Sequence, residues 1–292
     1  AADNLFDKLY DEDDKEFKLL LSCFMKKRND ASLKRLLWEA YAEVRSVAHY
    51  PQILENTKNL YTEEGFKEVC ESYFLTLKNK IAPLICAVER FKSEFPATKK
   101  ATIYNQLFEE MICALKTYGQ AGLFGAKPAL TVTRKPVDAA EDKEAGAAFK
   151  VFKDAISKKY AALCPDIDTE EKEREKFFKS GEVAVAFSSV LLQLDREYAV
   201  VKAEDNKLDY NDLEHLTLQL LSDEKIKDEI NSGFKYVFVD EYQDVNPVQE
   251  EIISAFCGET FLVGDVKQSI YGFRGSKSVF FTKKFENFGK GL

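Results

Sequence analysis

The sequence has no long apolar run, few histidines and no paired cysteines, and each absence excludes a class of protein. No apolar stretch approaches the length of about 18 residues that indicates a membrane-spanning helix. The N-terminus is acidic and polar, so we expect no signal peptide, no membrane partner and a cytoplasmic location. The two histidines, His49 and His215, lie far apart in the chain, which argues against a zinc site.

The cysteines lack a Cys-x-x-Cys pair, a spacing that is typical of free thiols in a reducing compartment. Because most of them fall on apolar faces of predicted helices, we expect buried side chains. The six positions are Cys23, Cys70, Cys86, Cys113, Cys164 and Cys257.

The 292 residues can bury a hydrophobic core, and this length favours two domains. A formal net charge of −8 argues at first against a nucleic-acid-binding protein, but phosphate contacts depend on local basic patches. A patch of this kind, or simply a solvated helix face, follows Asp265. Its charged residues are Lys267, Arg274, Lys277, Lys283, Lys284, Lys290 and one acidic residue, Glu286.

From Ala1 to about Asp205 the hydrophobic pattern is helical, and each apolar stripe is more typical of core packing than of a binding surface. The Gly- and Pro-rich segment 118–146 predicts a long surface loop with a short extended piece at 130–133. We expect Pro83 to kink the second stripe. The apolar stripes cover residues 33–44, 69–88, 103–115, 148–163 and 183–201.

The C-terminal part has the pattern strand, helix, strand. Tyr236 to Val239 is an apolar run without alternation, which predicts a strand buried on both faces of a parallel sheet. Asn246 and Pro247 predict the start of a helix, with Asn as the cap. A second buried strand is predicted at residues 260–263. The fold class is therefore mainly α with a C-terminal α/β part.

Polar side chains follow both predicted strands, where ligands bind in open α/β sheets. An Asp such as Asp240 can hold Mg²⁺ through its water shell, and an adjacent Glu such as Glu241 can orient and deprotonate a water molecule. Gln268, after the second strand, can donate a hydrogen bond to a phosphate. Phosphoryl transfer needs these three roles, which are metal binding, positioning of the attacking water and hydrogen bonding to the phosphate. Four apolar residues followed by Asp-Glu also occur by chance. For residues 236–241 taken alone, a chance match is therefore the alternative to a catalytic site.

Two motifs taken together are far more specific. Val239-Asp-Glu-Tyr-Gln-Asp244 and Gly264-Asp-Val-Lys-Gln-Ser-Ile-Tyr-Gly-Phe-Arg-Gly275 resemble motifs II and III of the UvrD/Rep-like superfamily-one DNA helicases. The Asp-Val-Lys-Gln wording and Asp212-Leu-Glu-His215 are most similar to AddA, a helicase–nuclease subunit that processes double-strand breaks. Phe273-Arg-Gly275 is closer to the RecB and UvrD form.

The resemblance implies an ATP hydrolase whose cofactors are ATP and Mg²⁺. It implies that Asp240 binds Mg²⁺, that Glu241 is the catalytic carboxylate and that Gln268 senses the γ-phosphate. We also expect Gln243 and Asp244 to brace the loop between the nucleotide and DNA sites.

The same resemblance implies single- and double-stranded DNA as partners. Tyr271 and Phe273 would stack on bases of the single strand, because every base has a π-face. Arg274 would tie these contacts to the nucleotide site. Ordinary core packing is the alternative for the two aromatic residues.

The resemblance assigns residues 1–205 to a helical 1B-like insertion domain and 206–292 to the C-terminal part of the first RecA-like P-loop NTPase domain. Leu208-Asp-Tyr-Asn-Asp-Leu213 resembles the stretch where the chain re-enters that domain, with Asp212 in a structural role such as a cap. The sequence contains no Gly-x-x-x-x-Gly-Lys-Ser/Thr loop to cradle phosphates.

We therefore expect a fragment, inactive alone, of an ATP-dependent DNA helicase with an exonuclease function and an AddB-like partner subunit. The parent would translocate on single-stranded DNA in double-strand-break repair and recombination. The alternative is a non-enzymatic helical module that binds DNA or a partner and retains a vestigial half-site.

Overall fold

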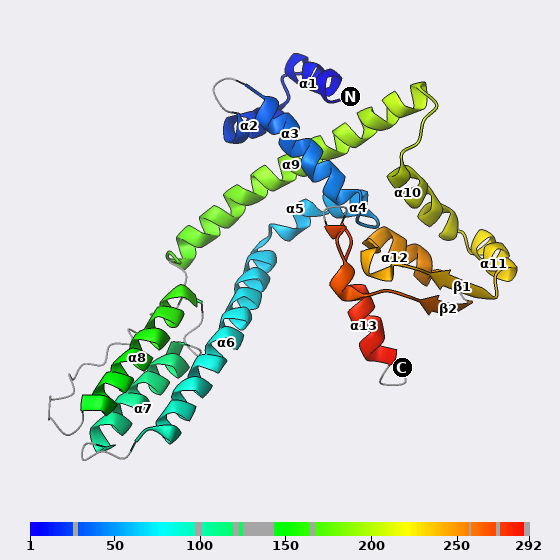
Figure 1. Ribbon diagram of the computed structural model, residues 1–292. Helices are drawn as coiled ribbons and strands as arrows, with labels where there is room; N and C mark the ends of the chain where they lie inside the picture. The colour runs from blue at the N-terminus through cyan, green and yellow to red at the C-terminus, as the bar shows by residue number, and fades with distance from the viewer. Residues whose placement is uncertain are drawn as a thin grey trace. The chain divides into compact units, whose positions relative to one another are not determined.

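A computed structural model gives the fold of the chain (Figure 1). The residues described form two compact units, residues 1–58 with 182–292, and residues 59–181. Helix α9 (Glu170–Glu204) begins in the second unit and ends in the first. The described ranges are 1–25, 29–96, 101–118, 123–124, 143–163, 167–256, 258–272 and 275–288.

The unit of residues 59–181 is built on three helices that lie side by side in Figure 1: α6 (Glu63–Glu94), α7 (Ala101–Tyr118) and α8 (Lys143–Leu163). Helix α6 continues past Pro83 to Glu94, and it buries only the second half of its predicted stripe. Its core residues are Leu77, Ile81, Leu84 and Val88, whereas Val69 and Tyr73 are exposed. The core also takes Leu107, Phe108, Met111 and Leu115 from α7 and Phe149, Ile156 and Tyr160 from α8.

The N-terminal helices of the other unit pack on the second half of α9. They are α1 (Ala2–Asp11), α2 (Lys15–Phe24) and α3 (Ala31–Val44), followed by the short α4 (Tyr50–Glu55) and α5 (Thr57–Leu60). Their shared core includes Leu5, Phe6, Phe17, Leu20, Leu33, Leu37, Val190, Leu191 and Leu194.

Helix α9 is, among the described residues, the one helix long and apolar enough by composition to cross a membrane. Core helices of ordinary globular proteins can have the same length and apolar composition. Here Ala186, Val190, Leu191 and Leu194 of α9 are buried in the core with α1 to α3, so packing explains the apolar character.

The predicted strand, helix, strand unit is confirmed. Strands β1 (Tyr236–Val239) and β2 (Glu259–Leu262) pair in parallel, with Val239 opposite Leu262. The fold is thus mostly helical with a small parallel sheet, and its division into a 1B-like and a RecA-like domain stays a prediction. The remaining elements are α10 (Tyr210–Leu221), α11 (Glu224–Gly233), α12 (Pro247–Ser254), α13 (Val279–Phe288) and the single-turn helices η2 (Tyr242–Asp244) and η3 (Val266–Gln268).

Helix α12 begins as its sequence predicts. The Asn246 side chain accepts a hydrogen bond from the Gln249 backbone N–H, and the Gln249 side chain accepts one from the Asn246 N–H. This reciprocal capping box, with Pro247 in the first turn, satisfies backbone donors that a helix start leaves free.

The prediction that both strands are buried on both faces is wrong. Phe238 is 74% exposed and Phe261 is 60% exposed. An apolar strand is buried on both faces only where layers of structure cover both faces. The described sheet has two strands, and part of its apolar surface stays open.

The prediction of buried cysteines is also wrong for those described. Cys23, Cys86 and Cys113 are free and exposed, and Cys70 is half-buried. Helices bury one stripe, and here the stripes are filled by larger apolar side chains. Cys164, Cys257 and the extended piece at 130–133 lie outside the described residues.

Candidate functional site

The two motifs meet at one edge of the sheet. Asp240 follows β1 directly, and Asp265 lies three residues after the end of β2. Because the strands are parallel, their carboxyl ends share an edge, and the ladder continues there from Val263 N–H to the Val239 carbonyl at 2.9 Å. The side chains of Asp240, Glu241 and Asp265 are exposed at this edge, where they can meet a ligand.

Glu241 has a left-handed backbone conformation, with φ 52° and ψ 37°. This region is uncommon for residues other than glycine, and such strain concentrates at functional sites. The Glu241 N–H donates to Oδ1 of the preceding Asp240 at 2.9 Å, which stabilises the sharp turn. The turn brings the chain from the strand directly into η2.

Gln243 connects the two motifs from inside the protein. Its side chain is almost completely buried. Nε2 donates to Oε2 of Glu241 at 2.6 Å, and Oε1 accepts from the Asp265 backbone N–H at 2.9 Å. A Cβ at Gly264 would lie 2.4 Å from Oε1 of Gln243, so this close approach requires glycine at position 264.

Asp265 organises the turn that carries Gln268. Its Oδ1 accepts from the Lys267 N–H at 2.9 Å, and its Oδ2 accepts from Nε2 of Gln268 at 3.0 Å. These two bonds, the one from Gln268 above all, lower the pKa of the Asp265 carboxyl. A continuous chain of hydrogen bonds therefore runs from Glu241 through Gln243 and Asp265 to Gln268.

Asp244 holds the segment that follows. Its Oδ1 accepts from Oγ of Ser269 at 3.1 Å and, at longer range, from the backbone N–H groups of Ile270 at 3.3 Å and Tyr271 at 3.4 Å. Gln243 and Asp244 thus hold the second motif at Asp265 and at residues 269–271. That they brace the loop between the nucleotide and DNA sites stays a prediction. Tyr271 is 40% exposed. Phe273 and Arg274 lie outside the described residues, so their roles stay predictions.

Tyr242, the residue between Glu241 and Gln243, belongs to the core. It is fully buried, and its hydroxyl donates a very short hydrogen bond to Oε2 of Glu250. Burial and the Glu250 carboxylate both raise the pKa of Tyr242. Lys284 from α13 pairs with Glu250 at 2.9 Å. The turn η2 therefore rests on α12 and α13.

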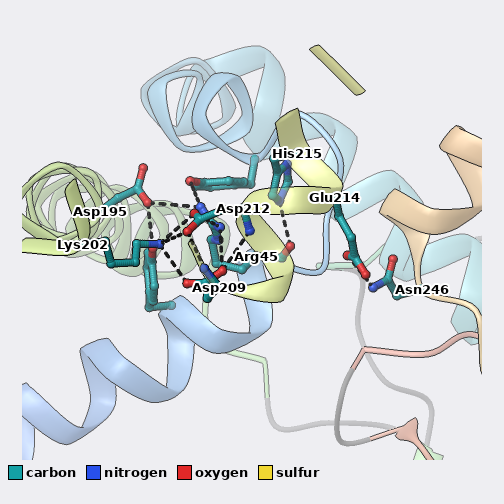
Figure 2. A network of polar contacts seen from close by, with 10 residues as sticks. Arg45, Asp195, Lys202, Asp209, Asp212, Glu214, His215 and Asn246 are labelled. Carbon is teal, nitrogen blue, oxygen red and sulfur yellow. Dashed lines mark hydrogen bonds and ion pairs between the residues drawn. The ribbon is translucent and has the colours of Figure 1, made fainter. Parts of the chain in front are cut away.

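A second polar network lies where the chain enters α10 (Figure 2). Arg45, at the end of α3, is 5% exposed and donates from Nη2 to Oδ1 of Asp212 at 2.7 Å. Lys202 of α9 is 9% exposed and donates to Asp209 at 2.8 Å and to Asp212 at 2.7 Å. These ion pairs join the end of α3 to the consecutive helices α9 and α10, which lie far from it in sequence.

The cap of α10 is Asp209, with Asp212 as its reciprocal partner. The Asp209 side chain accepts from the Asp212 N–H at 2.8 Å, and Asp212 accepts from the Asp209 N–H at 2.9 Å. Asp212 is therefore structural, as expected, but it is the third helical residue and not the cap itself. The Asp-x-x-Asp spacing is the sequence signal for this arrangement.

Glu214 and His215 carry the network toward the first motif. Oε2 of Glu214 accepts from Nδ2 of Asn246 at 3.1 Å (Figure 2). Oε1 of Glu214 accepts from Nε2 of Gln249 at 2.7 Å. His215 donates from Nε2 to the Arg45 carbonyl at 2.8 Å.

Sequence reasoning missed Arg45 and Glu214, because spacing along the chain gives no signal for such long-range contacts. It also missed Lys202, although its partners Asp209 and Asp212 follow within ten residues.

The donor set at the sheet edge is compatible with Mg²⁺ brought by a nucleotide. Within the described ranges no three His, Cys, Asp or Glu side chains gather as a metal cluster. Mg²⁺ keeps several waters and takes one or two protein carboxylates beside substrate phosphates. Asp240 offers one exposed carboxylate at the strand end, which meets this requirement.

Comparison with known proteins shows the family of the chain. The family model of the UvrD/REP helicase N-terminal domain matches residues 26–289. The chain belongs to the UvrD/REP helicase family. The match includes both motifs and residues of both compact units, and it begins after α2.

Several curated relatives carry the name predicted from the motif wording, the A subunit of an ATP-dependent helicase/nuclease. The chain is 30% identical to that protein of Ligilactobacillus salivarius (strain UCC118), over 98% of this chain and 25% of the relative. The corresponding protein of Thermoanaerobacter sp. (strain X514) is 28% identical over 99% of this chain and 26% of its own length. A 95-residue match to that of Alkaliphilus metalliredigens (strain QYMF) is 47% identical and covers 32% of this chain and 8% of the relative.

The resemblance to AddA helicase/nuclease proteins is thereby confirmed. The chain spans about a quarter of the length of the curated relatives that match nearly all of it.

Proposed function

We propose that this chain is the part of an ATP-dependent DNA helicase motor that holds motifs II and III, in a parent that couples ATP hydrolysis to translocation on single-stranded DNA. The carrying observation is the hydrogen-bond chain Glu241, Gln243, Asp265, Gln268. It joins an exposed carboxylate to an exposed amide at the ligand-binding edge of a parallel sheet.

In this proposal Asp240 holds Mg²⁺ and Glu241 is the catalytic carboxylate. Bound Mg²⁺·ATP supplies the transferable phosphoryl group, with its charge partly neutralised by the metal. Glu241 orients the attacking water and accepts its proton, while Gln243 fixes the orientation of the carboxylate. Gln268 donates to the γ-phosphate, and Arg274 links nucleotide and DNA.

DNA binds at the adjoining loop in this proposal. Tyr271 is exposed enough to stack on a base, and Phe273 is its predicted companion. Phosphates of single- and double-stranded DNA meet the basic residues after Asp265, among them Lys267 and Lys277, which are exposed. The helical block 1–205 is the 1B-like domain beside the DNA, and 206–292 belongs to the first RecA-like domain.

The proposed setting is double-strand-break repair in the cytoplasm. The relatives are named as the A subunit of an ATP-dependent helicase/nuclease, which supports a companion of the AddB type and an exonuclease function in the parent. The 292-residue chain alone is proposed to be inactive, since its sequence has no phosphate-binding loop.

The test is ATP hydrolysis by the full gene product with and without single-stranded DNA. The motor proposal predicts hydrolysis that DNA stimulates several-fold. DNA binding without any ATP hydrolysis would instead identify a binding module with a vestigial half-site, and would contradict the proposal.

A further inference from the structure

We propose that the adjacent residues Gln243 and Asp244 are positioning residues that couple DNA contact at Tyr271 to the Glu241 carboxylate. The proposal rests on the proposed function. The coupling is assigned to these two residues, which lie in the single turn η2. The Gln243 side chain holds the start of the second motif, at Asp265, and the Asp244 side chain holds residues 269–271. We call these two places the nucleotide end and the DNA end.

Gln243 holds the nucleotide end, and its task needs an amide. The side chain donates to the Glu241 carboxylate and accepts from the Asp265 N–H. A carboxylate at this position could not donate a hydrogen bond to the Glu241 carboxylate. An apolar side chain could neither donate to Glu241 nor accept from the Asp265 N–H. Because Gln243 is nearly fully buried, water cannot replace a lost partner without rearrangement.

Asp244 holds the DNA end. Its Oδ1 gathers the Ser269 hydroxyl and the backbone N–H groups of Ile270 and Tyr271. These contacts set the path of the backbone that carries the Tyr271 ring. A shift of that backbone when DNA binds therefore acts directly on Asp244.

The turn between these ends is stiff. The Asp244 N–H donates to the Glu241 carbonyl at 2.9 Å, and the Tyr242 N–H donates to the Val263 carbonyl at 2.9 Å. Buried Tyr242, bonded to Glu250, anchors the turn to α12. Displacement of Asp244 is thus passed to Glu241 through covalent geometry and through Gln243, over a path only three residues long.

The experiment compares Gln243→Leu and Asp244→Ala in the full gene product by three measurements. Residue-resolved hydrogen exchange without nucleotide should show faster exchange, by roughly fivefold to tenfold for one lost hydrogen bond, at Asp265 in Q243L. In D244A the faster exchange should appear at Ile270 and Tyr271 instead.

Function should separate in the same way. Single-stranded DNA binding without nucleotide should weaken about fivefold to tenfold in D244A and stay unchanged in Q243L. Basal ATP hydrolysis should fall in Q243L, because that variant loses a direct contact with the Glu241 carboxylate. Both variants should lose most of the DNA stimulation. Asp244→Asn keeps an acceptor oxygen and should restore most of the DNA affinity.

Glu250→Gln is the matched control, because its amide oxygen can still accept from the Tyr242 hydroxyl and keep η2 anchored, while only the charge that pairs with Lys284 is lost. It should retain DNA stimulation. Equal losses of stimulation in E250Q, or identical defects in Q243L and D244A, would overturn the coupling role and leave only general destabilisation. If the wild-type protein shows no DNA-stimulated hydrolysis, the proposed function itself has failed.

Discussion

Arg45 and Asp212 are 167 residues apart in the chain, yet Nη2 of Arg45 lies 2.7 Å from Oδ1 of Asp212 in a largely buried ion pair. The pair fixes the end of α3 against the start of α10. Burial by itself opposes ionisation of Asp212, but the hydrogen bonds from Lys202, the Asp209 N–H and Arg45 outweigh it and lower its pKa.

Asp212→Ala should therefore destabilise the fold by about 1.5–3 kcal/mol, because it removes hydrogen bonds from two buried cations that keep Asp209 as a second partner. Urea denaturation of the chain measures this. Lys179→Ala, which breaks an exposed pair with Glu175, is the control and should leave the urea midpoint nearly unchanged. Equal effects of the two substitutions would contradict the structural role of the network.

His215 should make stability depend on pH. Burial lowers its pKa, while the hydrogen bond to the Arg45 carbonyl acts in the opposite direction. The unfolded chain binds a proton near pH 6.5, which the folded chain takes up only at lower pH. The contribution of His215 is therefore complete above about pH 6.5 and is lost progressively below it.

His215→Gln keeps an N–H donor but does not titrate, so it should flatten the stability curve of the chain between about pH 5 and 7. Urea midpoints at several pH values measure this. A variant curve parallel to that of the wild type would show that another group is responsible.

Tyr271→Ala and Phe273→Ala should each weaken single-stranded DNA binding by the full gene product by about 1–3 kcal/mol, the usual value of one base–aromatic stack. Melting temperature and basal ATP hydrolysis should change little. Truncation of a core Phe would instead cost roughly 3–5 kcal/mol of folding stability. A large drop in melting temperature with unchanged affinity for a fluorescent oligonucleotide would show that the residue packs in the core and does not stack on DNA.

The 292-residue chain by itself should neither unwind DNA nor hydrolyse ATP at a measurable DNA-stimulated rate. Its sequence lacks the loop that cradles the β- and γ-phosphates. A malachite green assay on the purified chain, with the full gene product as the positive control, decides this. Turnover by the chain at ordinary enzyme rates would contradict the account of it as an incomplete motor.

Local sequence signals predicted the elements well. The Asn246 cap, the strand pair and the long α9 follow from residue types and spacing that act over a few neighbours. The exposure of Phe238 and Phe261 did not follow, because burial depends on which layers cover a strand and not on the strand alone.

The same limit applies to the site. The wording of the two motifs predicted Asp240, Glu241 and Gln268 as candidate site residues, and the structure places them at one sheet edge. The left-handed conformation of Glu241 and the contact of Gln243 with Asp265 depend on backbone geometry that residue types do not encode singly. The burial of Lys202 was not predicted for another reason, since a Lys on a long helix is most often solvated.

The most direct test of the central claim is ATP hydrolysis by the full gene product with Glu241→Gln, measured with saturating single-stranded DNA beside fluorescent-nucleotide binding. The amide can still accept the hydrogen bond from Gln243, but it cannot accept a proton from water. We predict that hydrolysis is nearly abolished while nucleotide binding is retained, and that Asp240→Ala also weakens Mg²⁺-dependent nucleotide binding. A Glu241→Gln protein that kept most of its hydrolysis would contradict the account.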